Sequence, residues 1–86
     1  MMAKYDVFFT RQALKDLKTL SPKLQKKLKE ILKEVIAAHP HRGKKLLGEF
    51  GGNYSYRLSL KDRIVYSIDE PKKQVYLKRV RTHYGD

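Results

Sequence analysis

Alternating apolar and polar positions predict a short strand at the start of the chain, followed by two helices. Residues 5–9 read as a short strand in which Tyr5, Val7 and Phe9 share one face. Thr10 occupies an N-cap position, and apolar side chains then recur at helical spacing over residues 11–20. Ser21 and Pro22 are typical of a new helix start, with a capping serine followed by proline in the first turn.

The second helix has the clearest periodicity in the chain. Its apolar positions form one stripe at helical spacing, and lysines fill the remaining arc, which we interpret as a solvated face. Pro40 ends this helix. The two helices are expected to form an antiparallel hairpin that lays its apolar side on a sheet. The stripe consists of Leu24, Leu28, Ile31, Leu32, Val35 and Ile36.

Three further strands are predicted after a loop rich in glycine and lysine at residues 39–53. Residues 54–60 and 63–69 alternate cleanly, and the two residues between them fit a hairpin turn. A turn at residues 70–73 leads to the last strand at residues 75–81.

This order of elements, β-α-α-β-β-β, predicts an α+β fold for a single domain spanning residues 1–86. A helical hairpin would pack on one face of a four-stranded, mostly antiparallel sheet. The opposite face, or one end of it, must then carry the polar side chains of the strands. These include Arg57, Arg63, Arg79 and Arg81.

Charge indicates what such a face would bind. The 86 residues carry a formal net charge of +11. Repulsion among so many positive charges is normally relieved by a bound polyanion, for which nucleic acid is the first candidate and an acidic protein the second. There is no cysteine, so neither a disulfide nor a thiolate zinc site is possible. No apolar run approaches a membrane span, and the N-terminus lacks a signal-peptide core. We therefore expect a cytoplasmic protein that does not bind membranes.

The end of the chain adds side chains that could act on phosphodiesters without a metal. Arginines hold phosphate oxygens in a planar fork, His83 can move a proton near neutral pH, and Tyr84 can stack on a base. Arginines on adjacent strands repel one another unless an anion lies among them. His39 and His41 alone are too few for a metal site, so we expect no metal or cofactor.

The loop before the second predicted strand offers three more candidates. Lys44 and Lys45 follow Gly43 and could project over the sheet to bind RNA, although a solvated loop is about equally consistent with its composition. Glu49 is a possible general base, and the simpler interpretation is that it pairs with a lysine.

Residues 52–69 and 79–86, together with the element order and length, resemble the RelE/ParE superfamily of bacterial toxins, most closely its Txe/YoeB branch. The Arg-x-Arg-x-His-Tyr ending at residues 79–84, after a basic strand, is the most specific part. The resemblance implies a RelE-like fold and a type II toxin that enters the ribosomal A site and cuts mRNA without metal. It also implies an acidic antitoxin as partner, with operator DNA bound only through the toxin–antitoxin complex.

Site residues carry over by position. Arg63 matches the transition-state arginine of the family, and His83 and Tyr84 match its paired C-terminal catalytic residues. Arg57 and Arg81 match basic residues that support the phosphate, and Arg79 is expected to bind RNA beside them. Lys44 stands where the branch often has a glutamate, so the general base is His83, Glu49 or a lysine.

Two other functions remain open. The first is a ParE-like gyrase inhibitor without nuclease activity, a branch that usually lacks the terminal His-Tyr pair. The second is a non-catalytic basic module that binds RNA through its phosphates alone.

Overall fold

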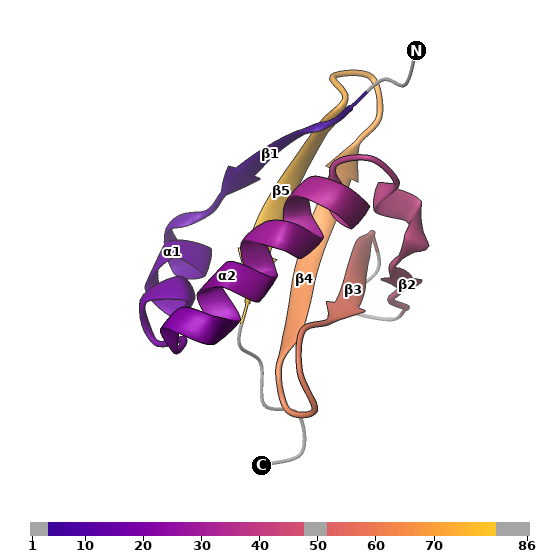
Figure 1. Cartoon of the computed structure of the whole chain (residues 1–86). Coiled ribbons are helices and arrows are strands. Elements are labelled where there is room, and N and C mark those ends of the chain that lie inside the picture. The colour runs from indigo at the N-terminus through magenta and orange to yellow at the C-terminus, as the bar shows by residue number, and fades with distance from the viewer. Residues whose placement is uncertain (1–3, 48–51, 81–86) are drawn as a thin grey trace.

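The computed structural model describes residues 4–47 and 52–80 (Figure 1). Two helices lie over a single sheet. The helices are α1 (Arg11–Lys18) and α2 (Pro22–Ile31), the latter continued by a π-helical segment η1 (Leu32–Ile36), with a 3-10 turn η2 (Pro40–Arg42) following. The strands are β1 (Asp6–Phe9), β2 (Lys44–Lys45), β3 (Asn53–Arg57), β4 (Arg63–Asp69) and β5 (Gln74–Arg79).

The sheet has the strand order β1-β5-β4-β3-β2. β1 runs parallel to β5, and every other pair of neighbours is antiparallel. The predicted α+β fold is confirmed, but the predicted count of four strands is one too low. The additional strand β2 lies inside the predicted loop, where two lysines pair with β3. Two polar residues carry no alternation, so the sequence pattern could not reveal this strand.

Both predicted helix caps are confirmed. The Thr10 side chain accepts a hydrogen bond from the Ala13 N–H at 3.1 Å, and the Ser21 side chain accepts one from the Leu24 N–H at 3.3 Å. Pro22 then occupies the first turn of α2, where the missing N–H of proline costs nothing.

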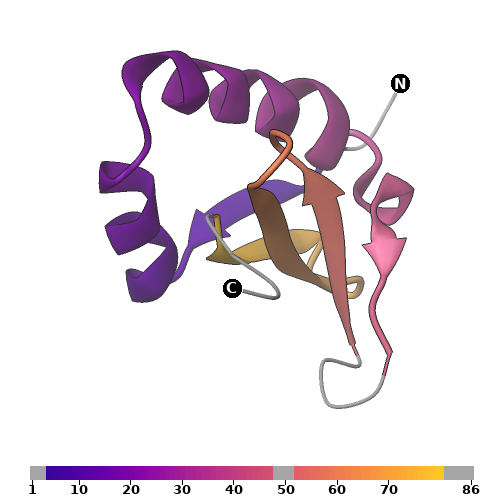
Figure 2. The same cartoon turned by 90° about the horizontal axis from the view of Figure 1, so that it is seen from below.

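The two helices are not a closely packed antiparallel pair. Figure 2 shows α1 and α2 running in clearly different directions, with α2 over one face of the sheet and α1 beside its β1–β5 edge. The turn between them keeps its own hydrogen bonds, because the Gln25 side-chain amide donates to the Leu17 and Leu20 carbonyls at 3.0 and 3.1 Å.

One hydrophobic core joins the helices to the inner face of the sheet. Leu28 and Ile36 of the α2–η1 helix pack with Ile64, Tyr66 and Leu77 of the central strands, and all five are fully buried. Burying each such side chain contributes about 1.5–3 kcal/mol. The predicted stripe therefore faces the sheet, and the lysines of α2 are exposed as predicted.

The hairpin between β3 and β4 differs from the prediction. β3 ends at Arg57, and a two-residue turn is replaced by a longer turn closed by Ser59 and Asp62. The Ser59 hydroxyl donates to the Asp62 carboxylate at 3.0 Å, while the Asp62 carbonyl accepts from the Leu58 and Ser59 N–H groups. Leu60, the last residue of the strand predicted at residues 54–60, lies in this turn and is 92% exposed.

Among the described residues, no helix is both long and apolar enough to span a membrane.

Candidate functional site

Arg57 and Arg63 lie directly opposite each other across the β3–β4 ladder. Their neighbours Tyr56 and Ile64, which also face each other, point into the core beneath the helices. Side chains alternate between the faces of a sheet, so the two arginines project from the face that carries no helix. We call Arg57 and Arg63 the arginine pair, and this surface the helix-free face.

The arginine pair is electrostatically unfavourable as it stands. Like charges opposite each other on a sheet are destabilising. Within residues 4–47 and 52–80, neither guanidinium has an ion-pair partner. Lys44 adds a third cation to the same face, because it is exposed and lies opposite Ser55, two residues before Arg57. An anion such as a phosphate would relieve the repulsion and receive two guanidinium forks.

Lys45 does not join this cluster. It lies opposite Tyr54, whose ring packs against the core, so alternation places Lys45 and Lys44 on opposite sides of the sheet. Of the two loop lysines proposed to bind RNA, the structure therefore brings only Lys44 to the face of the arginine pair.

Arg79 has an internal partner, unlike the arginine pair. Its Nε donates to the Asp16 carboxylate of α1 at 2.8 Å, and the Val80 N–H donates to the same oxygen at 3.2 Å. Burial favours a raised pKa for Asp16, but the hydrogen bonds from Arg79, Gln12 and Val80 outweigh it and hold the pKa below its usual value. Arg79 thus fastens the end of β5 to α1.

The position of Lys44 depends on a contact that the sequence did not indicate. The Tyr66 hydroxyl, fully buried in β4, donates to the Pro40 carbonyl at 2.6 Å and so fixes η2 against the sheet. Burial raises the pKa of Tyr66 to about 12, so it stays a hydrogen-bond donor at neutral pH. Gly43 passes directly over this phenol, and β2 begins at the next residue.

Four of the predicted site residues lie outside the described part of the chain. They are Glu49, Arg81, His83 and Tyr84. Their roles therefore stay predictions, including the choice of general base.

A second polar cluster lies at the other end of the sheet. Glu70, in the β4–β5 turn, accepts from the Tyr5 hydroxyl at 2.9 Å and pairs with His41 at 2.7 Å and Lys73 at 3.4 Å. The Tyr5 hydrogen bond is the main cause of a lowered Glu70 pKa. Among the described residues no group of three or more His, Asp or Glu side chains could hold a metal ion.

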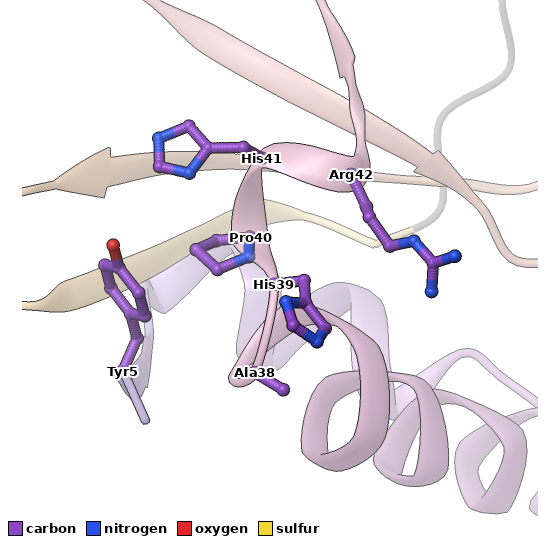
Figure 3. A pocket seen from close by; sticks show the side chains of 6 residues that line it. All are labelled: Tyr5, Ala38, His39, Pro40, His41 and Arg42. Atoms are coloured by element: carbon purple, nitrogen blue, oxygen red, sulfur yellow. The ribbon is translucent and has the colours of Figure 1, made fainter. Parts of the chain in front are cut away.

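Next to this cluster is an open cavity of about 580 Å³ around Pro40 (Figure 3). Tyr5 and His41 lie on one side of the proline, and His39 and Arg42 on the other. The side chains do not converge on one point, so the cavity lacks the arrangement of a reaction centre.

Comparison with known proteins identifies relatives that match most of the chain. Residues 7–86 match the family described as ParE toxin of type II toxin–antitoxin system, parDE. No curated protein sequence matches significantly.

Solved structures of similar fold are components of toxin–antitoxin systems. The RelBE2 complex of Mycobacterium tuberculosis aligns with a TM-score of 0.84 and 33% identity, covering 93% of this chain and 98% of the other. The heterotetrameric YoeB–YefM complex of Staphylococcus aureus aligns at 0.76 and 28%, covering 95% and 100%. The intact RelBE complex of E. coli aligns at 0.75 and 28%, covering 91% and 95%.

Proposed function

This chain belongs to the ParE toxin family of type II toxin–antitoxin systems, within the RelE/ParE superfamily, and from this premise we propose that it is a ribosome-dependent mRNA endonuclease. The observation that carries the proposal is the arginine pair, two guanidiniums held opposite each other without a described counter-ion. The similarity to RelE and YoeB structures over nearly the whole chain supports it.

The proposed reaction is attack of an mRNA 2′-hydroxyl on the adjacent phosphorus. The new bond gives a 2′,3′-cyclic phosphate, and the bond to the 5′-oxygen breaks. Arg63, assisted by Arg57 and Arg81, would stabilise the charge that grows on the phosphoryl oxygens. His83 would move the proton, with Glu49 or a lysine as the other candidate bases, and Tyr84 would orient the nucleotide.

Cleavage of a translated message on purified ribosomes, mapped by primer extension, tests the proposal. Arg63→Ala is expected to slow cleavage about 10²- to 10³-fold, the usual effect of losing one donor to a developing oxyanion. Lys72→Ala serves as control, because it removes an exposed cation from the β4–β5 turn, which follows the end of β4 opposite to Arg63. Unchanged cleavage by Arg63→Ala and His83→Ala proteins would exclude the proposed mechanism.

A gyrase-inhibiting toxin is the second candidate, and the match to the ParE family specifically favours it. The two functions separate in paired assays with the same protein preparation. A nuclease shortens message on ribosomes and leaves the supercoiling of plasmid by gyrase unchanged, whereas a ParE-like inhibitor gives the reverse pattern.

We further propose an acidic antitoxin as partner. The solved relatives include toxin–antitoxin complexes, and the net charge of +11 favours an acidic segment. The antitoxin encoded beside this chain is expected to abolish cleavage at stoichiometric concentration. Cleavage that persisted in the saturated complex would show that it does not block the site.

A further inference from the structure

Phe8 of β1 and Tyr76 of β5 form a stacked aromatic pair on the surface of the sheet. The two residues lie opposite each other in the parallel ladder, with ring centroids 5.7 Å apart and ring planes inclined by 25°. Phe8 is 44% exposed, although its neighbours Val7 and Phe9 pack against the core. A stacked pair of this kind leaves an outer ring surface open to solvent.

The ladder places this aromatic pair on the helix-free face. Tyr76 lies opposite Ser67 on β4, and Ser67 is four residues from Arg63 on the same strand. An even spacing along a strand keeps side chains on one face, so Phe8, Tyr76 and the arginine pair share a surface. Four residues of strand correspond to about 14 Å between the aromatic row and the arginine row.

Charge along this face is graded. The arginine pair and Lys44 lie toward one end, whereas Asp69 and Asp6 lie in the row beyond the aromatic pair. Phosphates are therefore favoured at the arginine end and disfavoured past the aromatics. A sheet face that combines cations with exposed aromatic rings is the arrangement by which single-stranded RNA is bound, with phosphates on cations and bases on rings.

We propose that Phe8 and Tyr76 form a stacking subsite for one base of single-stranded RNA, a few nucleotides from the phosphate held by the arginine pair. The proposal rests on the proposed function, since it assumes that RNA crosses the helix-free face. The subsite adds a base contact to the phosphate contacts at the arginines. Every nucleobase can make this contact, because every base has a face that can stack on an aromatic ring.

The competing explanation is purely structural. A cross-strand aromatic pair also stabilises the pairing of an edge strand such as β1. In that case its loss would lower stability without affecting any particular base of the RNA, and this difference allows a direct test.

The test couples a missing side chain with a missing base. The probe is a short fluorescein-labelled 2′-O-methyl RNA, which lacks the attacking hydroxyl, and a series in which each position in turn is abasic. Binding is measured by fluorescence anisotropy for the wild type and for Phe8→Leu and Tyr76→Leu, which keep apolar bulk on both strands. Phe8→Tyr is the matched control that keeps an aromatic ring.

With the wild type and Phe8→Tyr, one abasic position is expected to weaken binding roughly 5- to 100-fold. With the leucine variants that penalty should disappear, while the salt dependence of binding stays that of the wild type. Arg57→Ala should do the opposite, lowering the salt dependence and keeping the abasic penalty. Thermal unfolding of each variant reports any loss of structure separately.

Cleavage on ribosomes, measured in parallel, separates the two proposals. If the wild type cleaves message but the leucine variants keep the same abasic penalty, or no position shows one, the stacking subsite is wrong and the nuclease stands. If the wild type neither binds the probe nor cleaves message, both are wrong.

Discussion

At the level of single residues, Gly43 shows how closely the site is fitted to the core. A Cβ at this position would lie 2.1 Å from the Tyr66 hydroxyl oxygen and 2.9 Å from the Ser55 carbonyl oxygen. Gly43→Ala must therefore displace either the phenol or the start of β2. We expect it to lower the free energy of unfolding by roughly 1–3 kcal/mol, as measured by urea denaturation.

Gly52 provides the matched control for this substitution. Its φ of +88° is unfavourable for alanine, but a Cβ there would meet nothing within 4 Å. Gly52→Ala should cost about 1 kcal/mol through backbone strain alone. In a Tyr66→Phe background, Gly43→Ala should lower the free energy of unfolding by less than it does in the wild type. The effect of Gly52→Ala should stay the same. Equal changes for both would show that the clash with the hydroxyl is not the cause.

Asp16 is expected to make stability depend on acidic pH. Its pKa lies below the ordinary value of 3.8 in the folded chain, where it accepts hydrogen bonds from Arg79 and the Val80 N–H. A lowered pKa stabilises the fold at pH values above the unfolded pKa, and this contribution is lost as the pH falls through the folded one. The wild type should lose stability below about pH 4, and Asp16→Asn should lose less over the same interval. Parallel pH curves for the two proteins, from urea denaturation, would contradict this role.

At the level of elements, the two helix caps should differ in strength. The Thr10 hydroxyl accepts from the Ala13 N–H and also donates to the Leu77 carbonyl at 3.0 Å, so it joins α1 to β5 as well as capping the helix. The Ser21 side chain makes only the capping bond in the described structure, at 3.3 Å and exposed. Thr10→Ala is expected to lower the free energy of unfolding by about 1–2 kcal/mol, and Ser21→Ala by about 0.5–1 kcal/mol. Denaturant midpoints at constant m-value would measure both, and a larger loss for Ser21→Ala would contradict the assignment.

The elements that the sequence predicted well are those whose pattern reflects burial. The stripe of α2 and the alternation of β4 each point to one buried face, and β4 has the predicted bounds of Arg63–Asp69. The sequence did not reveal β2, whose two lysines are recruited by pairing with β3, nor the longer β3–β4 turn, which hydrogen bonds between Ser59 and Asp62 determine. Both depend on partners brought together by the fold.

The candidate site could likewise be predicted where it depends on a local pattern, and not where it depends on residues distant in the sequence. Alternation was enough to place Arg57 and Arg63 together on the face away from the helices. It could not show that Arg79 is held by Asp16, sixty-three positions away, because no local pattern records that pairing. The Phe8–Tyr76 stack was missed for the same reason, since it joins the first and last described strands.

At the level of the whole molecule, a net charge of +11 should make stability depend on salt. Self-repulsion favours the expanded chain, and added salt screens it over about 10 Å at 0.1 M. The melting temperature, followed by circular dichroism, is expected to rise with sodium chloride concentration. Arg57→Gln should raise the melting temperature at low salt and reduce its dependence on salt, because it removes one member of the arginine pair. A melting temperature that fell with salt would indicate that the ion pairs of Glu70 and Asp16 outweigh the repulsion.

The parallel pairing of β1 with β5 affects how the chain is made. Within the described residues β1 pairs only with β5, and Thr10 and Asp16 also bond to residues 77–80, so β1 and α1 gain these partners only after residues 74–80 have been synthesised. A nascent chain that stopped before residue 74 would lack the strand joining β1 to β4. Folding of the complete sheet therefore waits until residues 74–80 have been synthesised, and products terminated earlier should not form it.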